Sequence, residues 1–274
     1  MTFDKHGKVV RFSASVPDLD RYNREMAKGI FDKLFFVDHI EADVIVDYGC
    51  ANGAMLGILA RLFPEKTYIG FDISEAEVLA ARAAHEGMTF TSEWNEVVEI
   101  LRGFLRRGQK TAVTCSSIVH EVLSYGNPEE IETFWARIFD ERSFHWVVIR
   151  DMCASRSLSR PSDPISVAKV RQAYDPAAIV EFEQQWGTLE SNWSLVHFLL
   201  KYRYKANWSR ELTENYFPIN LEALMSRIPQ VWTPVMVEHF TLPFIRRQVM
   251  ADFGIDLQDR THLKLILHNS TDQH

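Results

Sequence analysis

Residues 44–60 read VIVDYGCANGAMLGILA, and residues 67–74 read TYIGFDIS. In the first stretch an apolar run ends in Asp47, turns through Gly49 and Gly53, and continues with the apolar spacing of a helix. In the second stretch another apolar run ends in the acid Asp72. A strand, a glycine-containing turn, a helix and a second strand that ends in an acid are together typical of a nucleotide-binding crossover.

The alternation of strands and helices continues along the chain. Strands are expected at 44–47, 68–71, 88–91, 110–116 and 144–149, and helices at 53–63, 75–85, 95–106 and 128–139. Upstream, apolar spacing predicts one or two amphipathic helices over 18–39. Such an alternation predicts an α/β fold with a mostly parallel sheet that is covered on both faces.

The alternation stops after Met152. About eighty residues follow with aromatic and helical signals but no convincing strand, so we expect a mainly helical insertion there. Strand patterns resume at 235–242 and 262–268, and a helix is expected at 244–253 between them.

Composition narrows the function classes. The net charge of −7 over 274 residues argues against non-specific nucleic-acid binding. We expect a cytoplasmic protein without a membrane partner, because no apolar stretch approaches the length of a membrane span and the N-terminus lacks a signal-peptide pattern. Three cysteines at unrelated spacings fit reduced thiols, and no metal site is expected. The oligomeric state stays open.

The chain resembles the class I S-adenosylmethionine-dependent methyltransferases over 44–151, and at the level of strand pattern over 235–269. The resemblance implies a Rossmann-like sheet of seven strands, with the last strand antiparallel and inserted between strands five and six. It also implies S-adenosyl-L-methionine as cofactor. The predicted organisation is then a helical lead-in or lid (1–43), a cofactor-binding domain (44–152 and 235–274) and an insertion that caps the substrate (153–234).

The resemblance places cofactor contacts on four segments that follow strands. They comprise Asp47, Gly49, Cys50, Ala51 and Gly53 in the first loop, Asp72 and Ile73 after the second strand, Glu93 and Trp94 after the third, and Ser116 after the fourth. In one respect the chain departs from the family, because Ala51 replaces the middle glycine and makes the turn slightly bulkier.

These residue types suit the cofactor chemically. Gly49 and Gly53 remove side chains and permit positive φ, and a helix that starts near Gly53 offers free N–H groups to a carboxylate. Asp72 can accept hydrogen bonds from ribose hydroxyls, while Glu93 and Trp94 suit the amine and the flat face of adenine.

Other readings of the same residues stay open. Trp94 could be a core aromatic, and Asp72 could cap the next helix, although Ser74 is the better cap. Nicotinamide binding is disfavoured because the loop reads GCANG rather than GxGxxG.

The segment 115–122, CSSIVHEV, carries the catalytic candidates. His120 and Glu121 lie just beyond the fourth strand, where open α/β sheets bind ligands. His120 could serve as the general base for a hydroxyl or amine, with Glu121 orienting it or steering the substrate. Alternatively, His120 is a helix-start residue bonded to backbone. Arg150 and Asp151 are expected to link sheet and insertion, or to anchor substrate.

The expected activity is methyl transfer to an O or N atom of a small molecule. A nucleic-acid acceptor is the alternative, because residues 195–210 (LVHFLLKYRYKANWSR) interleave four basic residues with aromatic ones. The same segment could instead be an amphipathic helix with solvated charges. Two further possibilities are a non-catalytic cofactor-binding subunit and a related fold with other chemistry, such as a lyase or an aminopropyl transferase.

Overall fold

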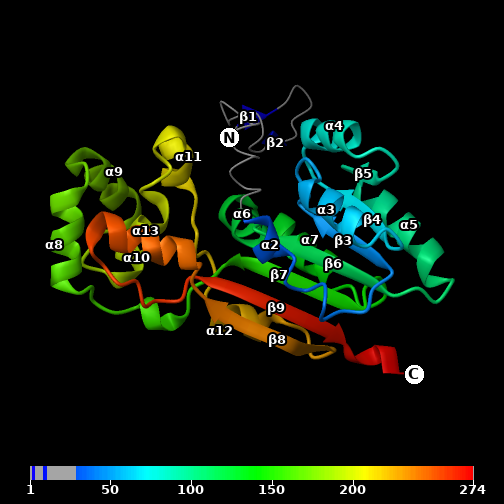
Figure 1. The fold of residues 1–274 in the computed structure, drawn as a ribbon. Coiled ribbons are helices and arrows are strands. Elements are labelled where there is room, and N and C mark those ends of the chain that lie inside the picture. Colours follow the sequence, from blue (N-terminus) through cyan, green and yellow to red (C-terminus); the bar gives the residue numbers. More distant parts are fainter. Residues whose placement is uncertain (1, 4–8, 11–28, 274) are drawn as a thin grey trace.

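The computed structural model describes residues 2–3, 9–10 and 29–273, and its centre is a seven-stranded sheet (Figure 1). The strand order is β5-β4-β3-β6-β7-β9-β8. Strands β3 to β7 are parallel to one another, and β9 runs antiparallel between β7 and β8. The predicted α/β fold is therefore confirmed, including the antiparallel last strand between strands five and six. The strands are β3 Val44–Tyr48, β4 Thr67–Phe71, β5 Thr89–Thr91, β6 Thr111–Ser116, β7 Trp146–Met152, β8 Trp232–Phe240 and β9 His262–Asn269.

Helices cover both faces of the sheet, as the alternation of strands and helices predicts, and all five residues of β3 are buried. One face packs against α3 Ala54–Leu62 and α4 Glu75–Ala84, through residues such as Leu56, Leu59 and Ala81. The other face packs against α5 Trp94–Leu105, α7 Pro128–Ile138 and α12 Leu221–Arg227. A short helix, α6 Val119–Tyr125, precedes α7 and was not predicted from the sequence.

The expected helical insertion is present beside the sheet (Figure 1). It contains α8 Pro164–Ala173, α9 Pro176–Trp186, α10 Asn192–Lys201 and α11 Trp208–Thr213. Asp163 and Asp175 cap α8 and α9, and a proline follows each cap, which explains where these helices begin. The core of the insertion also includes Ile245 and Val249 of α13 Pro243–Phe253, a helix that lies between β8 and β9 in the sequence.

The N-terminal helix prediction is only partly covered by the structure. Residues 18–28 lie outside the described part of the chain. The described helix, α2, spans Ile30–Lys33, and the predicted continuation over 34–39 is wrong. Successive backbone bonds from Val37 to Leu34 and from His39 to Phe36 form turns there, and these turns bury Leu34 and Phe36. A two-stranded antiparallel pair, β1 Thr2–Phe3 and β2 Val9–Val10, precedes α2 and was not predicted.

Candidate functional site

The loop after β3 has the left-handed backbone that its glycines permit. Gly49 and Gly53 have φ values of 80° and 76°. A Cβ atom on Gly49 would lie 2.7 Å from the Ile118 side chain, and one on Gly53 would lie 2.7 Å from the Phe90 ring. Backbone conformation and tight packing therefore both require glycine at these two positions.

Ala51 also has a left-handed backbone, with φ of 46°. This is the position at which the family's motif has its middle glycine. A Cβ atom at such φ values is sterically disfavoured, so the loop holds some backbone strain at this point.

Asp72 connects the loop after β3 to the loop after β4. Its Oδ2 accepts a 2.9 Å hydrogen bond from the Ala51 N–H, and its Oδ1 accepts one of 2.9 Å from the Ser74 N–H. Burial raises the pKa of this half-buried carboxyl. Each oxygen retains further acceptor capacity, so the carboxylate can also take a hydroxyl donor. Ser74 caps α4 by accepting the Glu77 N–H, as the sequence predicts.

Asp47 is buried at the end of β3. Its Oδ1 accepts a 2.9 Å hydrogen bond from the Thr114 hydroxyl, and desolvation raises its pKa to about 6. The charge of Lys33, which is half-buried at the end of α2, opposes this rise. At the end of β6, the Ser116 hydroxyl is buried and has no hydrogen-bond partner among the described residues.

Lys33 is a candidate site residue that was not predicted from the sequence. Desolvation and Arg150 lower its pKa, while Asp47, Asp151 and Glu121 act in the opposite direction. The neighbouring Asp32 fixes α2 by ion pairs of 2.7 Å to Arg150 and 2.8 Å to Lys264. Arg150 therefore links the sheet to α2 and not to the insertion, contrary to the first expectation for it. The position of Lys33 in the sequence does not indicate this role, because the charged residues around it come from distant parts of the chain.

The remaining predicted cofactor residues differ in exposure. Ile73 and Glu93 are exposed, whereas Cys50 is buried. Trp94 packs in an aromatic cluster, with ring centroids 5.3 Å from Tyr48 and 5.2 Å from Phe71. This is the core position that the sequence left open for Trp94, and a contact with adenine remains a prediction.

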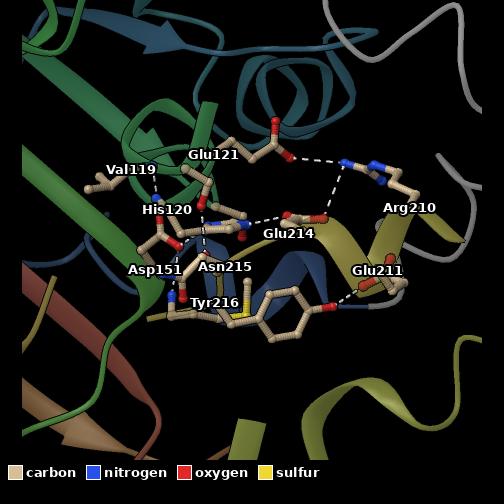
Figure 2. A network of polar contacts seen from close by, with 12 residues as sticks. Val119, His120, Glu121, Asp151, Arg210, Glu211, Glu214, Asn215 and Tyr216 are labelled. Atoms are coloured by element: carbon tan, nitrogen blue, oxygen red, sulfur yellow. Dashed lines mark hydrogen bonds and ion pairs between the residues drawn. The ribbon is translucent and has the colours of Figure 1, made fainter. Parts of the chain in front are cut away.

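The second half of the site is built around His120 (Figure 2). Its Nδ1 lies 2.5 Å from Asp151 Oδ1, and its Nε2 lies 2.8 Å from Glu214 Oε1. Burial alone would lower the pKa of His120, but the carboxylates of Asp151 and Glu214 outweigh it and raise the pKa well above its usual value. His120 therefore lies between two buried carboxylates, an arrangement that favours its protonated form.

Asp151 fixes this arrangement from the sheet. Its Oδ2 accepts the Val119 N–H at 2.6 Å, and its Oδ1 accepts the Met152 N–H at 2.6 Å. The same carboxylate thus organises the start of α6 and the orientation of the His120 ring.

Glu121 and Arg210 lie on the side of His120 that faces Glu214 (Figure 2). Arg210 Nη2 is 3.3 Å from Glu121 Oε1 and 3.8 Å from Glu214 Oε2. Burial, followed by repulsion from Glu214, raises the pKa of Glu121 to about 7, while His120 and Arg210 oppose the rise. Because the insertion supplies Arg210 and Glu214, it forms part of the site.

Lys201 holds the segment that supplies these two residues. Its fully buried ammonium group donates to the backbone carbonyls of Glu211 and Glu214 and lies 4.4 Å from the centroid of the Tyr216 ring. Desolvation lowers the pKa of Lys201 to about 8. Nothing in the sequence spacing predicts that Lys201 holds the segment whose Glu214 contacts His120.

The basic and aromatic segment 195–210 is therefore not an open surface of stacking rings. Of its basic residues only Lys205 is exposed, because Lys201 and Arg210 point inward and Arg203 is half-buried beside Tyr204. Among the described residues, no helix is long and apolar enough to cross a membrane.

Comparisons with known proteins agree with the resemblance drawn from the motifs. No family model matches the chain. Trans-aconitate 2-methyltransferases of Acidovorax ebreus and of another Acidovorax strain are each 36% identical to it over 70 residues, which is 26% of this chain and 27% of theirs. The match thus spans about a quarter of the length of these curated relatives.

Among solved structures, a methyltransferase dependent on S-adenosylmethionine from Anabaena variabilis has 11% identity and a TM-score of 0.49, covering 91% of this chain and 94% of its own. The geranyl diphosphate C-methyltransferase of Streptomyces coelicolor has 11% identity and a TM-score of 0.47, covering 96% and 83%. The strand order and the curated matches confirm the resemblance to class I methyltransferases.

Proposed function

We propose that this chain is a methyltransferase that uses S-adenosyl-L-methionine and transfers the methyl group to an O or N atom of a small acceptor. One observation carries the proposal. The strand order brings the glycine loop, Asp72 and the His120 network to neighbouring strand ends, which is where open α/β sheets bind their ligands.

The proposed cofactor contacts follow the polar groups of the two loops. Asp72 would accept the ribose hydroxyls, and the first turn of α3 would face the amino-acid end of the cofactor. Asp47 suits the ammonium group there, and Lys33 suits the carboxylate. Cys50, Ile73, Glu93, Trp94 and Ser116 complete the proposed lining.

The bound cofactor supplies an activated methyl group, so the chain has to orient the acceptor and remove one proton. We assign the orientation of the acceptor to His120, whose two ring nitrogens already contact carboxylates, and the removal of the proton to Glu121. Asp151 fixes the His120 ring, and the pKa of about 7 lets the Glu121 carboxylate exchange a proton near neutral pH. The insertion would exclude water, since it already contributes Arg210 and Glu214 to this network.

The acceptor is proposed to carry a carboxylate. The curated relatives are named for trans-aconitate, and three cations, Lys33, Arg150 and Arg210, lie among the acidic residues of the candidate site. The orientation of Lys201 and Arg210 removes the support that segment 195–210 gave to a nucleic-acid acceptor.

The proposal is tested by incubating the protein with S-adenosylmethionine and a panel of carboxylic acids that includes trans-aconitate, and measuring S-adenosylhomocysteine. We expect acceptor-dependent product, and a loss of at least about 100-fold in Glu121→Gln. The surface variant Glu99→Gln should retain full activity.

Other outcomes identify the competing functions. Binding of S-adenosylhomocysteine without turnover on any acceptor would indicate a non-catalytic subunit. Consumption of the cofactor without S-adenosylhomocysteine would indicate a lyase or an aminopropyl transferase.

A further inference from the structure

Three side chains of the His120 network converge on one point. Ligating atoms of His120, Glu121 and Glu214 all lie within 4.8 Å of one another, and this is the one such group of three in the described part of the chain. His120 and Glu214 are buried and Glu121 is half-buried. No metal site was predicted from the sequence, whose cysteines lack ligand spacing, and Glu214 comes from the insertion, 94 residues after His120.

The His120 ring has the orientation that metal-binding histidines use. Asp151 engages Nδ1 at 2.5 Å, which leaves Nε2 facing Glu214. Histidine ligands of metals usually donate the second ring N–H to a carboxylate in this manner, which fixes both the tautomer and the ring plane. The 2.8 Å between Nε2 and Glu214 Oε1 is also close to the edge of an octahedron, about 3.0 Å for bonds of about 2.1 Å.

A cationic side chain already contacts both carboxylates of this group. The Arg210 guanidinium lies 3.3 Å from Glu121 and 3.8 Å from Glu214, so it supplies the positive charge that the two carboxylates require. The contact to Glu214 exceeds hydrogen-bond length, and a small cation between the carboxylates would approach both more closely.

We propose that His120 Nε2 and carboxylate oxygens of Glu121 and Glu214 bind one divalent cation, which takes the place of the Arg210 guanidinium. One imidazole and two carboxylates favour Mn²⁺ or a similar ion. Three protein ligands leave coordination positions open for an acceptor oxygen. On binding, the proton of Nε2 passes to solvent.

The role of the ion rests on the proposed function, but its presence does not. In a methyltransferase, coordination would lower the pKa of an acceptor hydroxyl and hold its oxygen in place. His120 would then act as a ligand, and the acceptor proton would pass to a carboxylate of the site or to solvent.

The experiment measures Mn²⁺ alone, by loss of its free electron paramagnetic resonance signal on titration into metal-free protein without cofactor. We expect one ion per chain. His120→Gln, Glu121→Gln and Glu214→Gln should each weaken binding by about 10- to 100-fold. Glu211→Gln is the matched control, because this buried glutamate of the same segment bonds to Tyr216 and is not a proposed ligand, so it should weaken binding less than any of the three ligand variants.

Arg210→Met gives the sharpest result, since removing the competing guanidinium should tighten Mn²⁺ binding several-fold. If the network is only an Arg210-compensated ion-pair cluster, neither the wild-type protein nor Arg210→Met will bind Mn²⁺ at millimolar concentration. Equal binding by the wild type and all three ligand variants would also overturn the proposal. Glu121 is half-buried, so Glu121→Gln keeps the test valid if a buried variant fails to fold.

The outcome of the Mn²⁺ titration does not depend on whether the protein binds the cofactor. Mn²⁺ binding that depends on His120 and Glu214 in a protein that does not take up S-adenosylhomocysteine would contradict the proposed function but support the metal site. The reverse pattern would contradict only the metal site.

Discussion

The Asp72 carboxylate accepts a hydrogen bond of 2.9 Å from the backbone N–H of Ala51, 21 residues earlier in the chain. A second bond, from the Ser74 N–H, is made by the other carboxylate oxygen. This one side chain therefore sets the relative position of the two loops that are proposed to hold the cofactor.

Asp72→Ala should destabilise the fold as well as the proposed site. The substitution leaves two half-buried N–H groups without their acceptor, which costs about 1–3 kcal/mol for each group that water does not reach. The free energy of unfolding in urea should fall accordingly. Asp72→Asn keeps one oxygen acceptor, so its free energy of unfolding should fall less than that of Asp72→Ala. Equal falls in the two variants would contradict the role of Asp72 as the acceptor that joins the loops.

Ala51→Gly should leave the protein as stable or more stable. The φ of 46° is unfavourable for a residue with a Cβ atom, by about 1–2 kcal/mol, and the extra chain entropy of glycine offsets about 0.5–1 kcal/mol. Ala51→Val should lower stability, because a branched side chain tolerates this conformation poorly. Urea midpoints of the three proteins provide the measurement, and a clear loss in Ala51→Gly would show that the methyl group packs favourably.

Asp47 gives the stability a specific pH dependence. Its pKa is raised from 3.8 to about 6, so the folded state holds this proton more tightly than the unfolded state. Preferential protonation of Asp47 in the folded state adds about 3 kcal/mol to the free energy of unfolding at pH values below 3.8. This stabilisation is lost as the pH rises through about 6.

Asp47→Asn should therefore be more stable than the wild type at pH 7–8, with the advantage vanishing near pH 4, because Asn retains an acceptor for Thr114. Urea unfolding of both proteins across this range isolates the effect from other titrating groups. A difference that does not change with pH would rule out a buried, ionised Asp47.

Much of the fold was predictable because it depends on local patterns. The strand and helix positions follow from apolar spacing, and the antiparallel last strand follows from the resemblance. The loop residues Gly49, Gly53 and Asp72 were likewise predictable, since one crossover contains them all.

The half of the candidate site that is proposed to be catalytic was less predictable. His120 and Glu121 could be found because they follow a strand end. Glu214 and Arg210 could not, because the packing of the insertion, rather than sequence spacing, brings them to His120. Helix α6 was missed because it is short and its first turn is fixed by the distant Asp151.

Lys201→Met should loosen the segment that carries Glu214. The substitution removes the ammonium group from the carbonyls of Glu211 and Glu214, and each carbonyl left unpaired costs about 1–3 kcal/mol. The urea midpoint and the near-ultraviolet signal of the surrounding aromatic rings should both fall. Lys205→Met, at an exposed position of the same segment, should change stability by less than about 0.5 kcal/mol.

The central claim is that the two loops joined by Asp72 form the cofactor site, and calorimetric titration of the purified protein with S-adenosylhomocysteine tests it most directly. We predict that one molecule binds per chain and that Asp72→Asn weakens binding at least about 10-fold while its folded signal is retained. Absence of binding by the wild-type protein, or equal affinity in a folded Asp72→Asn variant, would contradict the account.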